Sequence, residues 1–185
     1  MRKALGFATT NQNKLQEVRS ILKLEARQLK VEVDEIQSMS VVTVAKKKAI
    51  DAYERLGRPK DVWVMVEDTG LHLKALNGLP GPMIKWWMSA IGAEGICMLL
   101  RGSSREAYAE TGIGIYDGHV CRTFSGRAYG TIADKPRGRR DFGWDCIFKP
   151  EGSSRTFAEM PKEDKNRISH RGKALSKVRR FLNSA

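Results

Sequence analysis

The sequence contains few cysteines, and they form no pattern that would build a disulfide framework or a zinc site. Cys97, Cys121 and Cys146 are odd in number and widely spaced, and none belongs to a CxxC pair. Such a set is typical of free thiols in a reducing compartment. We therefore expect a cytoplasmic protein that folds without disulfides and without structural zinc.

Long apolar segments are also missing. No run of about 18 apolar residues occurs, and the N-terminal MRKALGFATT has only a very short apolar run before polar residues return. A transmembrane helix needs roughly 20 apolar residues, and a signal peptide needs a longer apolar core than this one. We expect a chain with no membrane partner.

Repeats, low-complexity tracts and a recognisable interdomain linker are absent as well. With 185 residues, 41% of them hydrophobic and 29% charged, the composition is that of an ordinary globular protein rather than a disordered one. A chain of this length can bury a substantial core. We expect one domain that covers residues 1–185.

Charge is present in excess of one sign. The formal net charge is +12, and residues 137–180 contain 13 Lys or Arg against six Asp or Glu. A basic balance favours anionic partners such as nucleotides, nucleic acid or an anionic membrane surface. It does not choose among them, and a solvated basic face is the competing explanation for any single cation.

Strand and helix periodicities alternate along the chain, which indicates an α/β fold. The expected strands cover residues 4–9, 28–33, 62–66, 107–116 and 120–129. One expected helix begins at residue 13. The other expected helices cover residues 42–56, 84–91, 93–100 and 162–182. The last two strands flank the short segment DGH and form an antiparallel hairpin, so the sheet is expected to be mixed. GLPGP, residues 78–82, reads as a turn.

The first candidate for chemistry is TTNQNK, Thr9 to Lys14, at a junction between a strand and a helix. A helix N-terminus presents unpaired N–H groups and partial positive charge, so hydroxyls, an amide and a lysine gathered there can seat a phosphate. The Walker pattern GxxxxGK[ST] is missing, which excludes a P-loop. Polar residues that cap a helix are common in α/β proteins, and this competing explanation is favoured for the segment alone.

The second candidate is a set of acids, Glu35, Glu67 and Asp68, of which the last two follow the expected strand 62–66. Ligands of α/β sheets bind beyond the carboxyl ends of strands. Carboxylates placed there can hold Mg²⁺ together with phosphate oxygens, and one of them can draw a proton from an attacking water. Solvated turn residues are an equally good explanation of these acids on their own.

Two further segments could recognise a base. FGWD, residues 142–145, offers flat rings beside a glycine and an acid that can accept from ring N–H groups. EDKNRISHR, residues 163–171, offers Lys165 and Arg171 to a phosphate or a base edge. Core packing and a solvated basic helix are the alternatives.

Taken together, four segments resemble the inosine triphosphate pyrophosphatase family, whose members hydrolyse non-standard purine nucleoside triphosphates to the monophosphate and pyrophosphate. They occur in the family's order and span nearly the whole chain: FATTNQNKLQEV, VEDTGLHLKALNGLPGPMIKWW, FGWDCIF and TFAEMPKEDKNRISHRGKAL. The resemblance implies a central elongated mixed sheet flanked by helices, two lobes with the active site in the cleft between them, and a homodimer. Thr10 stands where the family usually has glycine.

The resemblance also implies roles for individual residues. Asp68 is the expected general base, with Glu67 as an auxiliary, and Glu35 and Asp68 are the expected ligands of Mg²⁺, for which Mn²⁺ can substitute. Contacts to the triphosphate and its surroundings are expected from Thr9, Thr10, Asn11, Lys14, Lys46, Thr69 and Lys85. Contacts to the base are expected from Phe142, Gly143, Trp144, Asp145, Lys165, Ser169, His170 and Arg171. Lys46 is one of three consecutive lysines, Lys46 to Lys48, that the matching segment could align.

The sequence therefore predicts an Mg²⁺-dependent pyrophosphatase of ITP, dITP and XTP. Two alternatives stay open. A nucleic-acid-binding protein would fit the charge of +12, but acids in a phosphate-backbone groove would repel the ligand, so nucleic acid is not the expected partner. A pyrophosphatase that prefers a pyrimidine or a modified base would share the chemistry and differ only in the base pocket.

Overall fold

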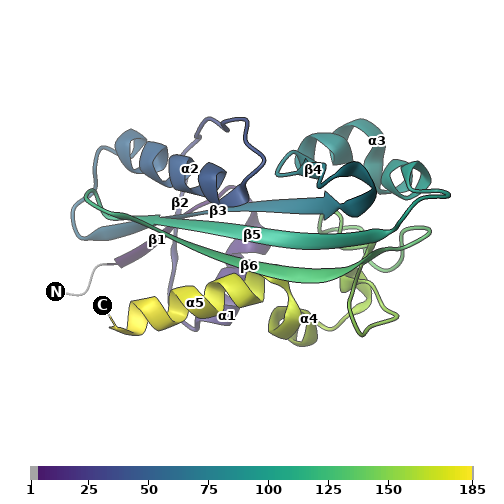
Figure 1. Ribbon diagram of the computed structural model, residues 1–185. Helices are drawn as coiled ribbons and strands as arrows, with labels where there is room; N and C mark the ends of the chain where they lie inside the picture. Colours follow the sequence, from purple (N-terminus) through teal and green to yellow (C-terminus); the bar gives the residue numbers. More distant parts are fainter. Residues whose placement is uncertain (1–3, 185) are drawn as a thin grey trace.

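A seven-stranded mixed sheet forms the centre of the protein in the computed structural model, which describes residues 4–184 (Figure 1). The strand order is β2-β1-β3-β5-β6-β7, with β4 paired to β3. The strands are β1 (Ala4–Ala8), β2 (Arg27–Leu29), β3 (Val62–Leu73), β4 (Pro80–Gly81), β5 (Glu106–Tyr116), β6 (Cys121–Ile132) and β7 (Phe148–Pro150). β1 is parallel to β2 and β3, and every other pairing is antiparallel. The predicted α/β class, mixed sheet and hairpin are confirmed.

Helices cover both sides of this sheet. They are α1 (Gln12–Leu22), α2 (Val41–Arg55), α3 (Ile84–Leu99), α4 (Lys162–Ile168) and α5 (His170–Ser184), and two 3-10 turns cover Lys74–Leu76 and Phe157–Glu159. In Figure 1, α2 lies above the long strands, whereas α5 and α1 lie below them. The division into two lobes that the resemblance implied stays a prediction.

Side-chain alternation along β3 explains how the sheet separates two cores. Met65 belongs to the core beneath α1 and α5, whereas Val64 and Val66 belong to the core beneath α2. By the same alternation, Glu67 points toward α1 and α5 and Asp68 points toward α2. The two acids therefore face opposite sides of the sheet, although they are adjacent in sequence.

The strand that carries these acids is longer than predicted. The expected strand ended at Val66, but β3 continues to Leu73 because β5 pairs with it from Val64 to Leu73 without interruption. Glu67 and Asp68 therefore lie inside a strand. They still lie just beyond the parallel part of the sheet, since β1 pairs with β3 only as far as Met65.

Three other boundaries differ from expectation. The strand predicted for residues 28–33 stops at Leu29, because β1, its pairing partner, ends at Ala8. The GLPGP turn contains β4, which pairs with β3 through Pro80 and Gly81. β7 was not predicted from the sequence.

The predicted last helical region is two helices. Ser169 interrupts it with an extended backbone (φ −69°, ψ 158°), and its Oγ accepts a hydrogen bond of 3.0 Å from the Gly172 N–H. The side chain thereby caps the new helix α5. This break places His170 and Arg171 at the start of α5.

Candidate active site

Four segments that are distant in sequence meet at one small cavity of about 120 Å³. They are the start of α1, the middle of β3, the loop before β7 and the start of α5. The lining residues are Asn11, Lys14, Thr69, Asp141, Phe142, Gly143, Trp144, Asp145, His170 and Arg171. Nine of these ten were predicted from the sequence, and only Asp141 was not.

A lysine holds two acids together on the α2 side of the sheet. The Lys48 Nζ lies 2.6 Å from the Glu35 Oε1 and 3.4 Å from the Asp68 Oδ1. The side chain of Lys48 is only 12% exposed, whereas that of Glu35 is 37% exposed. Two carboxylates from separate segments therefore converge on the ammonium group of Lys48. Carboxylates arranged in this way are also expected around a metal cation.

Lys48 is not the lysine that the family resemblance favoured, which was Lys46. Lys46 is exposed on α2, two residues from Lys48 and hence on a different side of the helix. Its backbone carbonyl faces the Cys121 thiol of β6 at 3.9 Å. The structure therefore brings Lys48, and not Lys46, to the predicted metal ligands.

Asp68 has the environment of a general base. Burial raises the pKa of its carboxyl to about 6, although the positive charges of Lys48 and Lys14 oppose the shift. Its Oδ2 is buried and has no hydrogen-bond partner among residues 4–184. A carboxylate with one unsatisfied buried oxygen can take a metal ion or a water proton.

Glu67 on the other side of the sheet is fully occupied by cations. The Arg171 Nε and Nη2 donate to its two oxygens at 2.7 and 2.9 Å, and the Lys14 Nζ lies 3.1 Å from its Oε1. Burial alone would raise the pKa of Glu67, but the charges of Arg171 and Lys14 outweigh it and lower the pKa to about 2. These contacts indicate that Glu67 positions Arg171 and Lys14, and they leave it poorly placed for the auxiliary catalytic role predicted for it.

Glu17 on α1 belongs to the same network and was not predicted. Its Oε2 accepts from the Arg171 Nη1 at 2.5 Å, and its Oε1 accepts from the Lys165 Nζ at 2.8 Å. Burial acts against ionisation, but Arg171 and Lys165 keep the pKa of Glu17 low. Only its place three residues after Lys14, inside the helical face that carries Leu15 and Val18, hinted that it would point inward.

Lys165 joins Glu17 to Asp145. The Lys165 Nζ lies 2.5 Å from the Asp145 Oδ2 and 4.0 Å from the centre of the Phe142 ring. Burial raises the pKa of Asp145, against the nearby charge of Lys165. Because Asp145 lines the cavity, its carboxyl can accept a hydrogen bond from a ligand there.

Aromatic rings form the remaining wall. The rings of Trp144 and His170 are 5.2 Å apart, and the Arg171 guanidinium lies 5.2 Å from the Phe142 ring. His170 is buried with an unpartnered Nδ1 among the described atoms. Burial, together with the charge of Arg171, lowers its pKa well below the ordinary value, so the imidazole is neutral. Phe142 and Trp144 both line the cavity, and aromatic rings with nearby donors suit a flat heterocycle.

The segment TTNQNK, which the sequence predicts as a phosphate seat, lies at the start of α1. Asn11 is the N-cap of α1, and its side chain accepts from the Lys14 N–H at 3.1 Å. The Thr9 Oγ1 accepts from the Asn11 N–H at 3.1 Å. Thr10 is exposed and does not line the cavity. The helix N-terminus therefore faces the cavity through Asn11 and Lys14.

Nine of the predicted residues lie outside the cavity lining: Thr9, Thr10, Glu35, Lys46, Glu67, Asp68, Lys85, Lys165 and Ser169. Ser169 is buried beneath it as the cap of α5. Lys85 is exposed at the start of α3, with its Nζ 5.3 Å from the Trp86 ring centre, and its charge contributes to a lowered pKa of Glu35. Lys85 is thus on the Glu35 side of the site.

A complete protein cage for a metal ion is not part of this site. Within residues 4–184 no group of three or more His, Cys, Asp or Glu side chains is arranged to hold a metal. The same part of the chain contains no helix long and apolar enough to cross a membrane. Two carboxylates are nevertheless sufficient for Mg²⁺, which takes one or two of them and completes its shell with water and substrate phosphates.

The chain matches the model of the Ham1 family over residues 5–181. It is 41% identical to a dITP/XTP pyrophosphatase of Hyperthermus butylicus, over 95% of this chain and 93% of that protein. It is 44% identical to an inosine triphosphate pyrophosphatase of Aspergillus fumigatus, over 96% of this chain and 94% of that protein. A solved HAM1 protein from Coxiella burnetii shares 28% identity and superposes with a TM-score of 0.85, covering 99% of this chain and all of that one.

Proposed function

The chain belongs to the Ham1 family, and we propose that it hydrolyses ITP, dITP and XTP to the nucleoside monophosphate and pyrophosphate. The observation that carries the proposal is the pairing of Asp68 and Glu35 around Lys48 beside a cavity built from FGWD and the start of α5. One part of this site suits a triphosphate with its cation, and the other suits a flat base.

The cation proposed for the phosphate part is Mg²⁺, with Mn²⁺ as a substitute. Glu35 and Asp68 would hold it, since both present carboxylate oxygens to the Lys48 ammonium group. The Asp68 Oδ2 also has no partner among residues 4–184. When bound, such a cation neutralises phosphate charge and acts as a Lewis acid.

In the proposed reaction, Asp68 accepts a proton from a water molecule as the water oxygen attacks the α-phosphorus. The bond between the α-phosphorus and the oxygen that bridges to the β-phosphate breaks, and pyrophosphate leaves with that oxygen. A pKa of about 6 leaves Asp68 ionised at neutral pH but still basic enough for this transfer. Lys14 and Lys48 release part of their ion pairing to the acids and stabilise the phosphate charge, and Lys85 adds to it from the rim.

Base selection is assigned to the network around Glu17. Arg171 lines the cavity and presents N–H donors suited to a 6-oxo group, and Asp145, held by Lys165, presents an acceptor suited to the N1–H of the same base. Adenine has the opposite pattern at these two positions, so it would leave buried polar groups unpaired. Glu17 forms ion pairs with Lys165 and Arg171, and Glu67 forms an ion pair with Arg171, so the two acids hold these cations in place.

The direct test is a substrate panel with pyrophosphate release as the readout, measured with Mg²⁺, with Mn²⁺ and with a chelator. We expect turnover of ITP, dITP and XTP that far exceeds turnover of ATP, and loss of activity in the chelator. Equal turnover of ATP, or release of orthophosphate, would contradict the proposal. Preference for a pyrimidine triphosphate would keep the chemistry and reassign the base.

The proposal includes a homodimer in the cytoplasm. All three cysteines are free thiols, as a reducing compartment requires. For dimerisation the sheet offers the part of its α2 side that α2 does not cover, where a groove of about 990 Å³ contains Tyr108 and Tyr129. Tyr129 is 56% exposed, and the groove carries charges of both signs, which suits a face that pairs with itself.

A further inference from the structure

The excess of positive charge has a specific location on the surface. α1 and α5 lie on the same side of the sheet and pack against each other (Figure 1). Their exposed side chains include Arg19, Lys173, Lys177, Arg179 and Arg180. Glu17 is the one acid in either helix, and its carboxylate is turned inward to Lys165 and Arg171. We call the five exposed cations the α1–α5 basic face.

The charges of this face are not neutralised locally. None of its five cations forms an ion pair with a residue in the range 4–184 that the structure describes. Lys177 donates to the Ser125 carbonyl at 2.7 Å and Arg19 donates to the Ala26 carbonyl, and both contacts leave the positive charge uncompensated. The face therefore presents a positive potential without nearby acids of its own helices.

The spacing of the cations on α5 suits a ligand with several phosphates. Lys173, Lys177 and Arg180 are separated by four and three residues, so they lie along one side of the helix over roughly 10 Å. A single nucleoside triphosphate would reach only part of this row. Duplex nucleic acid carries about one charge per 1.7 Å of its axis and can contact the whole row.

The same surface argues against two other anionic partners. Its exposed positions are polar or charged, and the nearest aromatic side chain, Phe181, is half-buried against Trp63 and Phe124 and beneath Arg122. A membrane-binding helix needs apolar side chains to insert, and a single-strand platform needs exposed rings on which bases stack. The surface offers neither.

The acids that argued against nucleic acid are elsewhere. Glu67, Asp68 and Asp145 are buried, and Glu35 pairs with Lys48 on the opposite side of the sheet. They cannot repel a phosphate chain laid along the outside of α1 and α5. The objection raised by the sequence therefore applies to the active site and not to the α1–α5 basic face.

We infer that the α1–α5 basic face binds the phosphate backbone of duplex nucleic acid without sequence preference. This is a second activity, independent of hydrolysis, because none of its five cations contacts the catalytic cavity. It keeps a nucleotide-hydrolysing protein in association with nucleic acid through charge alone, and it is reversible with salt.

The test is fluorescence anisotropy of the full chain with a labelled DNA duplex of roughly 20 base pairs, across KCl concentrations of about 50 to 200 mM. We expect the logarithm of the binding constant to fall with the logarithm of salt with a slope near −4.5, since each of the five cations contributes roughly −0.9 through its phosphate contact. Replacing Lys173, Lys177 and Arg180 together by Gln should reduce the slope by about 2.7 and weaken binding at least about tenfold at low salt.

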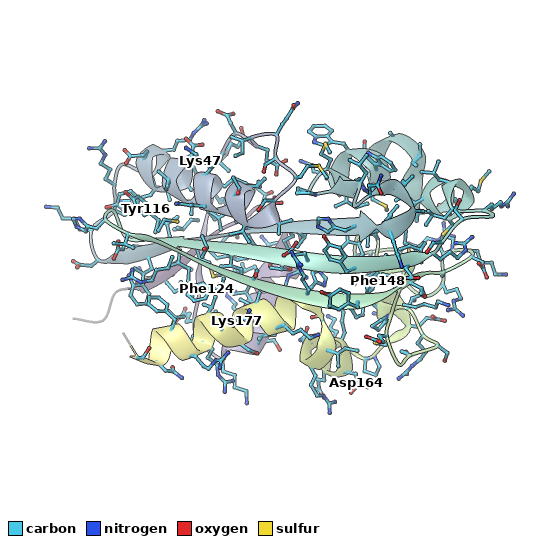
Figure 2. The ribbon with its side chains drawn as sticks, viewed as in Figure 1. Lys47, Tyr116, Phe124, Phe148, Asp164 and Lys177 are labelled. Carbon is cyan, nitrogen blue, oxygen red and sulfur yellow. The ribbon has the colours of Figure 1, made fainter. Side chains whose placement is uncertain are left out.

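A matched control removes the same number of charges from other surfaces. Lys47 lies on α2, on the far side of the sheet from Lys177 (Figure 2), and the exposed Lys30 and Lys135 lie outside both helices. Replacing these three by Gln should leave the slope within about one unit of the wild-type value. Pyrophosphate release and the melting temperature, measured on both variants, show that each is folded and that hydrolysis is unaffected.

Three outcomes would overturn the inference. They are no binding of the duplex at the lowest salt, equal loss of binding in the two triple variants, and binding of anionic phospholipid vesicles without binding of the duplex. Failure of the hydrolysis assay in the wild-type chain would count against the proposed function and would leave this result unaffected.

Discussion

At the scale of single residues, Asp68 differs from its neighbour Glu67 in its pKa and in the partners of its carboxylate oxygens, both of which matter for proton transfer. Burial raises the pKa of Asp68 to about 6 and leaves one oxygen without a partner in the described chain, whereas Arg171 and Lys14 occupy Glu67 and lower its pKa to about 2. The alternation of β3 causes the difference, because it sends the two carboxylates into different surroundings.

Replacing Asp68 by Asn should lower kcat for ITP by roughly 10² to 10⁴, the usual contribution of a general base. The fold should persist, because burial already disfavours the ionised carboxyl that the amide replaces. The comparison variant is Asp164→Asn, on the surface of α4 and visible in Figure 2, which should match the wild type. Near-full activity of Asp68→Asn would remove Asp68 from the mechanism.

The three consecutive lysines can be separated by substitution. Lys48→Met should lower kcat/KM for ITP by about 10², comparable to the loss of one donor that stabilises transition-state charge. Lys46→Met should change it by less than roughly twofold, since Lys46 is exposed and the ion pairs to Glu35 and Asp68 are made by Lys48. The reverse ranking, measured by steady-state kinetics, would restore the alignment that favoured Lys46.

His170 should make stability depend on pH. Burial, reinforced by Arg171, lowers the pKa of His170 well below 6.5 in the folded protein. Below about pH 6.5 the unfolded chain binds a proton that the folded chain does not, so stability is retained above this pH and falls as pH decreases, by up to about 1.4 kcal/mol per unit.

Urea unfolding near pH 7.5 and 5.5 measures this dependence. His170→Phe removes the titrating group but keeps a ring beside Trp144, so its stability should fall less over this interval. Asp68, whose pKa is about 6, titrates over this interval in both proteins, and its effect cancels in the difference. Equal slopes in the two proteins would contradict the assignment.

At the scale of elements, glycines determine how closely helices approach the sheet. A Cβ on Gly126 of β6 would lie 2.3 Å from the His170 carbonyl oxygen and 2.5 Å from the Ala174 nitrogen, both backbone atoms of α5. Gly112 of β5 plays the same part for α2, where a Cβ would lie 2.6 Å from the Val41 carbonyl oxygen. The helices that carry Lys48 and Arg171 are therefore positioned by residues that have no side chain.

Gly126→Ala should push α5 away from the sheet, lowering the free energy of unfolding by roughly 1–3 kcal/mol and raising the KM for ITP. The KM effect follows because His170 and Arg171 begin α5. Ser125→Ala, at the adjacent position on the other side of the sheet, should change stability by no more than about 0.5 kcal/mol. Thermal unfolding and kinetics of both variants provide the comparison, and an unchanged Gly126→Ala would show that α5 can shift freely.

At the scale of the whole molecule, the uncovered part of the sheet should be closed by a second copy. Light scattering after size exclusion should give twice the chain mass of 20.8 kDa. Tyr129→Asp should shift the mass toward the monomer, because it replaces an exposed aromatic ring that lines the groove by a charge. A monomeric wild type, or a dimer that tolerates this substitution, would exclude this face.

The alternation of strand and helix periods determined the α/β class, and the DGH hairpin determined that the sheet is mixed, because side-chain period and turn chemistry are local properties. The same is true of most residues that line the cavity. Their segments carry recognisable groups at fixed positions, such as FGWD and the helix start after Thr9.

Only the tertiary structure decided which groups face one another. The length of β3 depended on its pairing with β5. Which of the three lysines reaches Asp68 depended on the side of α2 that faces it, and this lysine is Lys48. The role of Glu17 depended on the packing of α5 beside α1. Each of these is a distance between segments far apart in sequence, and such distances arise from packing. The position of the positive charge has the same origin: the sequence determined its amount, and the pairing of α1 with α5 collected part of it on one surface.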